Sequence, residues 1–183
     1  MNLHPLSTAH IPLVAEWLQW KENYQWLDFG GGRQIVSDTM LKIMTQRGDN
    51  HLRVFTSEKA DVPIGLVGLS NIALNFGTAS LWYVLGNKTY EGQGYTTRAV
   101  SSLLRFGFDN LALASVSAWA CVDNRPSIQV LEKNHFRLAG RLRHSHRVNE
   151  VPVDRLLFDL LASEYQPVDD RDLASSGGAL SYP

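Results

Sequence analysis

The segment from Leu81 to Tyr95 places the strongest constraint on the fold of this chain. A run of strand-forming residues ends in Tyr-Glu-Gly-Gln-Gly-Tyr at residues 90–95 and passes directly into a helical pattern. Gly92 and Gly94 can adopt backbone angles that other residues avoid, so successive N–H groups can turn toward one anion at the positive end of the helix. The sequence therefore predicts a strand, a phosphate-binding loop and a helix in succession.

The helix after this loop has one apolar face, and the loop differs from two common nucleotide-binding loops. The apolar positions have the spacing of a buried helix face, at Val100, Leu103, Leu104, Gly107 and Leu111. No Gly-Lys-Ser/Thr follows the glycines, and the third glycine of the dinucleotide fingerprint is absent from its expected position. Neither ATP nor NAD is favoured as the ligand.

A second strand and helix follow the first pair. Residues Ser115 to Val122 alternate between core-type and other side chains, which is typical of a strand. Asn-Arg-Pro-Ser at residues 124–127 then opens a helix that runs to about Asn134, with Asp123 or Asn124 as its cap and a proline in its first turn.

Together, these motifs resemble the acetyl-CoA-binding core of the GNAT superfamily of N-acetyltransferases. The most similar branch contains the ribosomal-protein N-terminal alanine and serine acetyltransferases, and the matching stretches are residues 92–99, 124–127 and 132–136 (Glu-Lys-Asn-His-Phe). The resemblance implies an α+β fold in α/β/α layers. In this fold a mostly antiparallel mixed sheet has splayed central strands and is flanked by helices.

Three positions depart from the pattern of that family. Thr89 stands where Arg or Gln is usual, so one phosphate contact is expected to be missing. His135 replaces a glycine, and histidine tolerates left-handed backbone better than most residues. Leu131 falls where many members carry a tyrosine that acts as the general acid.

The resemblance also implies roles for individual residues on the cofactor side. Backbone groups of the strand before the loop would pair with pantetheine, the loop would hold the pyrophosphate, and Ser127 would donate to the departing thiolate. Asn124 would hold pantetheine or a water molecule, although both residues also suit simple helix capping. The predicted cofactor contacts are Tyr83, Val84, Leu85, Glu91, Gly92, Gln93, Gly94, Tyr95, Thr96, Thr97, Asn124, Ser127 and Lys133.

The acceptor amine is expected near residues 17–32, a stretch that is rich in aromatic and acidic residues. Trp26, Asp28 and Phe29 are the predicted substrate contacts, because ring faces and carboxylates can receive a cationic amine. Core packing explains the same aromatic pattern equally simply. Asp28 is the predicted general base, with a water relay as the alternative, so the predicted catalytic residues are Ser127, Asn124 and Asp28.

Periodicity and turn residues predict the remaining elements and one domain over residues 1–165. Residues 166–183 form a tail rich in Asp, Ser, Gly and Pro that is expected to be mobile. The predicted helices are Thr8–Trp20 and Ile35–Thr45, with a flexible break at Gly30–Gly32; the predicted strands are Leu3–Leu6, Leu52–Thr56, Val62–Ile72 and Thr78–Leu85, and a late hairpin pairs Arg137–Arg147 with Val151–Leu161.

Composition narrows the range of partners and locations. A net charge of −1 gives no electrostatic reason to expect nucleic acid, and no apolar run is long enough to span a membrane. The single cysteine, Cys121, excludes an internal disulfide and fits a reducing, cytoplasmic location.

The combined expectation is an N-acetyltransferase that moves the acetyl group of acetyl-CoA to a primary amine, by direct attack in a ternary complex and without a metal. A protein N-terminus is the leading acceptor, and a small amine such as an aminoglycoside, a polyamine or an amino acid is the alternative. A non-catalytic acyl-CoA-binding sensor and a structural domain with a vestigial loop are the other readings. The resemblance implies a monomer or a homodimer.

Overall fold

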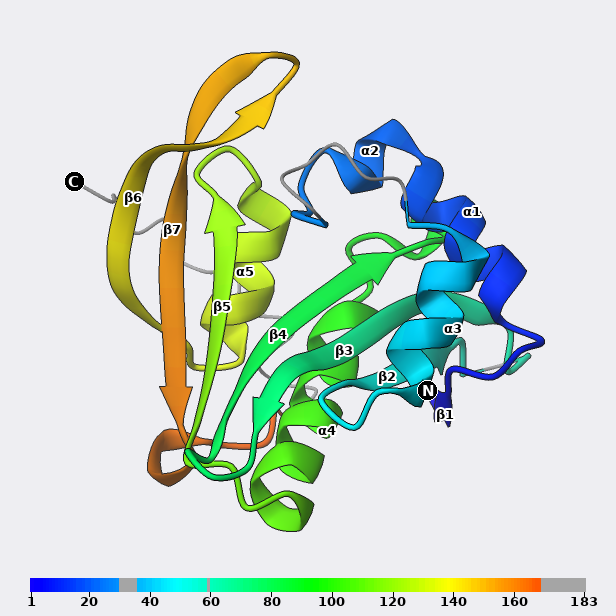
Figure 1. Ribbon diagram of the computed structural model, residues 1–183, viewed down its shortest axis with the longest axis horizontal. Helices are drawn as coiled ribbons and strands as arrows, with labels where there is room; N and C mark the ends of the chain where they lie inside the picture. The colour runs from blue at the N-terminus through cyan, green and yellow to red at the C-terminus, as the bar shows by residue number, and fades with distance from the viewer. Residues whose placement is uncertain (30–35, 59, 169–183) are drawn as a thin grey trace.

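A central mixed sheet with helices on both faces forms the framework of the protein (Figure 1). The computed structural model describes residues 1–29, 36–58 and 60–168. The strand order is β1-β2-β3-β4-β5-β7-β6, and every neighbouring pair is antiparallel except β4 with β5. The strands are β1 (Leu3–Pro5), β2 (His51–Thr56), β3 (Pro63–Ala73), β4 (Thr78–Leu85), β5 (Ser115–Cys121), β6 (Arg137–Val148) and β7 (Val151–Leu161); the helices are α1 (Ile11–Gln19), α2 (Lys21–Tyr24), α3 (Asp38–Gln46), α4 (Tyr95–Asn110) and α5 (Arg125–Lys133).

The first predicted helix is shorter in the structure and is followed by a separate one. Thr8 and its neighbours form a turn, and α1 begins only at Ile11, with a proline in its first turn. Trp20 is extended, with ψ at 128°, and this interrupts the helix before α2 begins. The apolar spacing from Thr8 to Trp20 therefore located the buried face correctly but not the helix ends.

The second predicted helix begins at Asp38 rather than at Ile35. The hydroxyl of Ser37 accepts a hydrogen bond from the Met40 N–H at 3.3 Å and caps the first turn of α3. The predicted break at Gly30–Gly32 lies outside the described residues. Of the predicted tail at residues 166–183, the structure describes 166–168, where the Val168 N–H donates to Ser101 Oγ at 3.0 Å.

The sheet separates two apolar cores. On one face, α4 and α5 pack against the sheet through residues such as Val100, Leu104 and Ile128. On the other face, α1 and α3 contribute Leu18 and Leu41. Along β4 the side chains alternate between the two cores, since Leu81 and Tyr83 contact the first whereas Trp82 and Val84 contact the second.

The two central strands diverge after a short parallel pairing. Thr78–Ser80 pairs with Ser115–Ser117, yet β4 continues to Leu85 and β5 to Cys121 (Figure 1). Beyond this pairing, the edge of β4 that faces β5 has no strand partner. Apart from the Leu85 carbonyl, which accepts from Lys88 Nζ, its N–H and C=O groups are available to another extended molecule. The splayed, mixed sheet predicted from the motifs is confirmed.

A close approach at the end of β4 makes Gly86 sensitive to substitution. A Cβ atom at this position would overlap the indole of Trp17, which is buried in α1. Because neither the strand end nor the ring has room to move, we expect Gly86→Ala to lower the free energy of unfolding by about 2–3 kcal/mol in urea titrations. Gly140→Ala is the matched control, since no atom lies within 4 Å of a Cβ there. Equal unfolding midpoints for the two variants would contradict this prediction.

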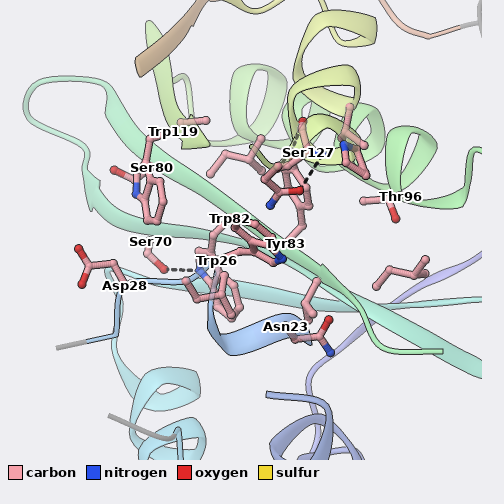
Figure 2. Close-up of a pocket in the computed structure, with 18 of the residues that line it drawn as sticks. Asn23, Trp26, Asp28, Ser70, Ser80, Trp82, Tyr83, Thr96, Trp119 and Ser127 are labelled. Atoms are coloured by element: carbon pink, nitrogen blue, oxygen red, sulfur yellow. Dashed lines mark hydrogen bonds between the residues drawn. The ribbon is translucent and has the colours of Figure 1, made fainter. Parts of the chain in front are cut away.

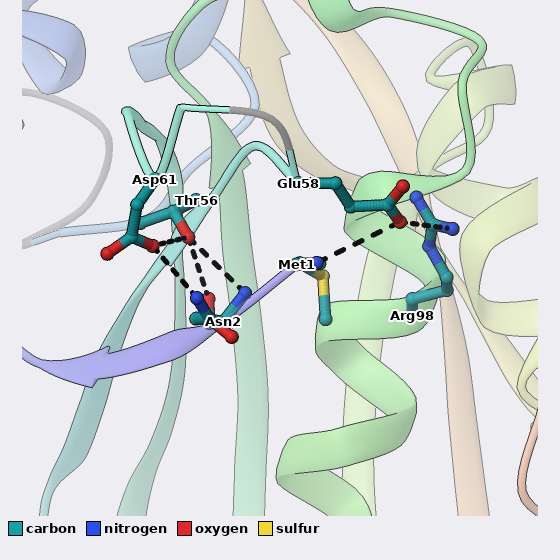
Figure 3. Close-up of polar contacts among 6 residues, drawn as sticks. All are labelled: Met1, Asn2, Thr56, Glu58, Asp61 and Arg98. Carbon is teal, nitrogen blue, oxygen red and sulfur yellow. Dashed lines mark hydrogen bonds and ion pairs between the residues drawn. The ribbon is translucent and has the colours of Figure 1, made fainter.

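A polar cluster joins β1 to the segment between β2 and β3 (Figure 3). The Asp61 carboxylate accepts hydrogen bonds from Thr56 Oγ1 at 2.6 Å and from Asn2 Nδ2 at 3.1 Å, and His4 Nε2 lies 3.1 Å away. These hydrogen bonds lower the pKa of Asp61 from 3.8 to about 2. The charged carboxylate is therefore the form that holds β1 in place.

The lowered pKa of Asp61 predicts a particular pH dependence of stability. A carboxyl group whose pKa is depressed in the folded state contributes its stabilisation above the unfolded pKa and loses it as the pH falls through the folded pKa. We expect the Tm difference between the wild type and Asp61→Asn to be constant above about pH 5 and to shrink between pH 4 and 2. Asparagine tolerates the φ of +48° at this position, so the variant tests the charge alone. A Tm difference that stays constant down to pH 2 would show that the charge plays no part.

No helix within the described parts of the chain is long and apolar enough to cross a lipid bilayer.

Candidate active site

A cleft of about 1600 Å³ occupies the region where β4 and β5 separate, and residues from both faces of the sheet line it. On one side lie the loop after β4 and the first turns of α4 and α5. On the other side lie α2, the following segment to Phe29 and one face of α3. Two molecules can therefore approach one another from opposite sides of the sheet.

The glycine loop has the geometry of an anion cradle. Gly92 and Gly94 have φ angles of +73° and +75°, and Gly94 is the N-cap of the 16-residue helix α4. The first-turn N–H groups of Tyr95 and Thr96 have no intrahelical acceptor, as in any helix. No side chain caps this helix, so these groups can bind a ligand. A Cβ at Gly92 would meet no atom within 4 Å. The open, positively polarised loop fits the phosphates of a CoA molecule.

Neighbouring side chains fix the shape of this loop. Gln93 Nε2 donates to the Thr89 carbonyl at 2.9 Å, and the hydroxyl of Thr89 donates to Asn87 Oδ1 at 2.7 Å. From α5, Asn134 Nδ2 donates to the Thr97 carbonyl at 3.2 Å. Thr89 thus stabilises the loop through these hydrogen bonds, whereas the family usually has Arg or Gln at this position to contact a phosphate.

Ser127 and Tyr83 meet on the side of the splay covered by α5, where the sequence predicts the cofactor (Figure 2). The Tyr83 hydroxyl donates to the Ser127 carbonyl at 2.9 Å and lies 2.8 Å from Ser127 Oγ. Burial raises the pKa of Tyr83, so the phenol keeps its proton at neutral pH. The sequence predicted Tyr83 for its backbone groups alone, and it missed this contact between residues 44 positions apart.

The remaining predicted cofactor residues lie along the same cleft. Asn124 lines it and also caps α5, because its Oδ1 accepts from the Ser127 N–H at 3.3 Å. Lys133 lines it from the last turn of α5. Leu131 is fully buried in the apolar core and faces no reactant, and His135 has the predicted left-handed backbone, with φ at +63°.

A half-buried lysine, Lys88, connects the two sides of the cleft. Lys88 Nζ donates to the Leu85 carbonyl at 2.8 Å and to Asn23 Oδ1 at 2.6 Å, while Asn23 Nδ2 donates to the Trp17 carbonyl. Burial lowers the pKa of Lys88. The end of β4, predicted to contact pantetheine, is therefore tied to α2, on the side of the predicted acceptor residues.

The predicted acceptor residues line the opposite side of the cleft (Figure 2). The ring of Phe29 packs edge-on against Trp82 with centroids 5.1 Å apart, and Trp82 Nε1 donates to Ser70 Oγ at 2.9 Å. Trp26 lies beside them, and the Asp28 carboxylate is 2.6 Å from Arg155 of β7. The structure thus brings Trp26, Asp28 and Phe29 into the same cleft as Ser127.

Arg155 is the centre of a network that the sequence did not reveal. Its guanidinium lies over the Trp119 ring at 4.1 Å and donates to His146 Nδ1 at 2.9 Å. Because a guanidinium can only donate, His146 Nδ1 is the acceptor of this contact, and His146 Nε2 donates to the Gln25 carbonyl at 2.8 Å. The segment from Gln25 to Asp28 is therefore tied to β6 and β7.

Within residues 1–29, 36–58 and 60–168, no three His, Cys, Asp or Glu side chains converge as ligands.

Known proteins are similar to this chain in sequence and in fold. The model of the acetyltransferase (GNAT) domain family matches residues 1–137. An uncharacterised N-acetyltransferase of Bacillus licheniformis is 32% identical over 132 residues, which cover 72% of this chain and 71% of that protein. The ribosomal-protein-serine acetyltransferase of Escherichia coli K12 is 25% identical over 167 residues, covering 86% of this chain and 90% of the relative.

Among solved structures, the spermidine N-acetyltransferase of Vibrio cholerae in complex with CoA and spermine superposes with a TM-score of 0.78. It is 17% identical, and the match covers 90% of this chain and 96% of that one. At this identity the likeness concerns the fold.

Proposed function

Because this chain belongs to the GNAT family of acetyltransferases, we propose that it transfers the acetyl group of acetyl-CoA to the free amine of a protein N-terminus. The protein is an N-acetyltransferase, and acetyl-CoA is its co-substrate. The shape and chemistry of the cleft on the side opposite the glycine loop favour this acceptor.

That side of the cleft offers apolar surface to a peptide. Met40, Ile43 and Met44 have the spacing of one helix face on α3 and line the cleft, and Ile43 is 52% exposed. Trp26 and Phe29 extend the same surface. A peptide can place apolar side chains on such a stripe, whereas a polyamine has no side chains to place there. This contrast supports a peptide acceptor.

The cofactor side supplies binding and help for the leaving group. The N–H groups that follow Gly94 hold the pyrophosphate, and the unpaired edge of β4 pairs with the pantetheine amides. Ser127 Oγ donates a hydrogen bond to the sulfur as the C–S bond breaks. The Tyr83 hydroxyl donates to the Ser127 carbonyl and lies 2.8 Å from Ser127 Oγ, so it fixes the position of Ser127 beside the developing thiolate.

The acceptor side supplies the nucleophile. The amine nitrogen attacks the acetyl carbonyl carbon, and the tetrahedral intermediate collapses with loss of the thiolate. The proton on nitrogen passes to Asp28, directly or through water, and Arg155 holds that carboxylate at the rim of the cleft. Asn124 holds pantetheine or a water molecule next to Ser127.

Ligand-dependent thermal unfolding tests this assignment. We expect CoA and acetyl-CoA to raise the Tm, whereas ATP and NAD leave it unchanged, because a ligand at 100 times its Kd adds about 2.7 kcal/mol to the free energy of unfolding. Mass spectrometry should then show acetylation of peptides that begin with Ser or Ala, in preference to spermidine and an aminoglycoside. Acetylation of small amines alone would overturn the proposed acceptor, and CoA binding without turnover of any amine would indicate a sensor.

A further inference from the structure

Asp159 on β7 faces the acceptor side of the cleft. Its neighbours Phe158 and Leu160 are both buried in the core formed with α4 and α5. Because side chains alternate along a strand, Asp159 lies on the opposite face of the sheet, and it is among the residues that line the cleft. It was not among the residues predicted from the sequence.

Two serine hydroxyls lie in the same row of the sheet. Asp159 is the register partner of Ser117 on β5, and Ser117 is the register partner of Ser80 on β4. The two serine Oγ atoms are 3.3 Å apart. Side chains directly opposite one another on neighbouring strands are adjacent, so the row forms one polar patch. It lies where the pairing of β4 and β5 ends, which is the closed end of the splay.

The Asp159 carboxylate has no cationic partner among the described residues, unlike two other carboxylates that line the cleft. Asp28 pairs with Arg155 at 2.6 Å, and Asp49 pairs with Arg47 at 2.6 Å. Within the described residues, the Asp159 carboxylate takes part in no ion pair or hydrogen bond. Its register partner on β6, Arg137, pairs instead with Glu164 at 2.9 Å.

A half-buried carboxylate without a partner is costly for the empty protein. A cationic ligand that enters the cleft removes this cost by forming a charge-assisted hydrogen bond. A serine hydroxyl can accept further N–H donors, and a primary ammonium carries three of them. The patch therefore matches a primary ammonium group at the end of a chain.

We propose that Asp159, with the hydroxyls of Ser80 and Ser117, binds the ammonium group of the acceptor and places its nitrogen at the closed end of the splay. This role rests on the proposed acetyl transfer and adds the site that recognises the amine. It is distinct from proton removal, which involves Asp28 at the rim.

The test compares Asp159→Asn with the wild type by using a Ser-initiated hexapeptide amide and spermidine as acceptors. Asparagine keeps the size of the side chain and removes its charge. We expect the KM for the amine to rise at least tenfold, the KM for acetyl-CoA to stay within twofold, and the Tm to be unchanged or higher. Asp159→Glu should recover part of the loss. Asp109→Asn, an exposed site at the end of α4 that does not line the cleft, is the control.

The possible results separate this inference from the proposed function. An amine KM for Asp159→Asn within twofold of the wild type overturns the role of Asp159 and leaves acetyl transfer intact. If the wild type binds CoA but acetylates neither amine, the proposed acetyl transfer to these amines is wrong. Titration of the hexapeptide amide into the CoA complex then tests whether Asp159 binds the amine. Peptide binding that weakens tenfold in Asp159→Asn supports the site, and peptide binding that is absent or unaltered overturns it.

Discussion

Replacing Gly94 with valine is expected to abolish acetyl-CoA binding while the protein stays folded. Gly94 is the N-cap of α4, with φ at +75° and ψ at 1°, in the backbone region that β-branched residues avoid. The strain at one position costs about 1–2 kcal/mol, which a folded domain tolerates. The valine side chain, or the loop shift that relieves its strain, removes the space and the N–H directions that the phosphates need.

Calorimetric titration measures this effect. We expect the Kd for acetyl-CoA to rise at least 100-fold, equivalent to about 2.7 kcal/mol, and the Tm shift with CoA to disappear. Gly48→Val is the matched control, because a Cβ at Gly48 would meet no atom within 4 Å and the residue lies outside the glycine loop. Unchanged affinity in a folded Gly94→Val protein would refute the cradle.

Removing the Ser127 hydroxyl is expected to reduce kcat by about 100-fold, with little change in the Kd for acetyl-CoA. The hydroxyl is held 2.8 Å from Tyr83 Oη at the cofactor side of the splay, and its donor strengthens toward sulfur only as negative charge develops there. Loss of one preorganised donor to a developing anion typically costs about 10²–10³ in kcat. Steady-state kinetics on Ser127→Ala, with cofactor binding measured separately, gives the comparison.

Tyr83→Phe distinguishes a catalytic Ser127 from a helix residue. The variant keeps the ring and removes the hydroxyl that orients Ser127, so kcat should fall less than in Ser127→Ala, and the double variant should resemble Ser127→Ala. The helix cap offers a control, because the Ser127 N–H to Asn124 contact involves backbone and survives the alanine change. A wild-type kcat in Ser127→Ala would reduce its role to the start of α5.

The sequence located the parts of the fold and of the site that depend on local patterns. Strand β4 has the predicted bounds Thr78–Leu85, because its residues form strands and turns flank it on both sides. The glycine loop and Asn124 were likewise readable, since backbone angles and helix caps are set by residues adjacent in the chain. The misplaced starts of α1 and α3 reflect capping and turn geometry, which periodicity does not report.

The hydrogen bonds and ion pairs on the proposed acceptor side could not be predicted from local sequence patterns. Arg155 reaches Asp28 across 127 positions, and His146 reaches Gln25 across 121. In the sequence, Asp159 is an ordinary polar residue on a strand with alternating polar and apolar side chains. That no cationic side chain pairs with it becomes apparent only when the positions of the neighbouring residues are known. Such features depend on the register between strands that are far apart in the chain. The hydrophobic pattern predicts which face of the sheet a side chain takes, but not which residue of a distant strand lies opposite it.

The alternation of side chains along β4 also bears on how acceptor preference can diverge. Odd-numbered positions such as Leu81 and Tyr83 face the proposed cofactor side, and even-numbered positions such as Ser80 and Trp82 face the proposed acceptor side. A substitution at an even position therefore alters the acceptor surface while the acetyl-donor machinery keeps its packing. One strand thus allows new amines to be sampled during evolution without rebuilding the site that handles the thioester.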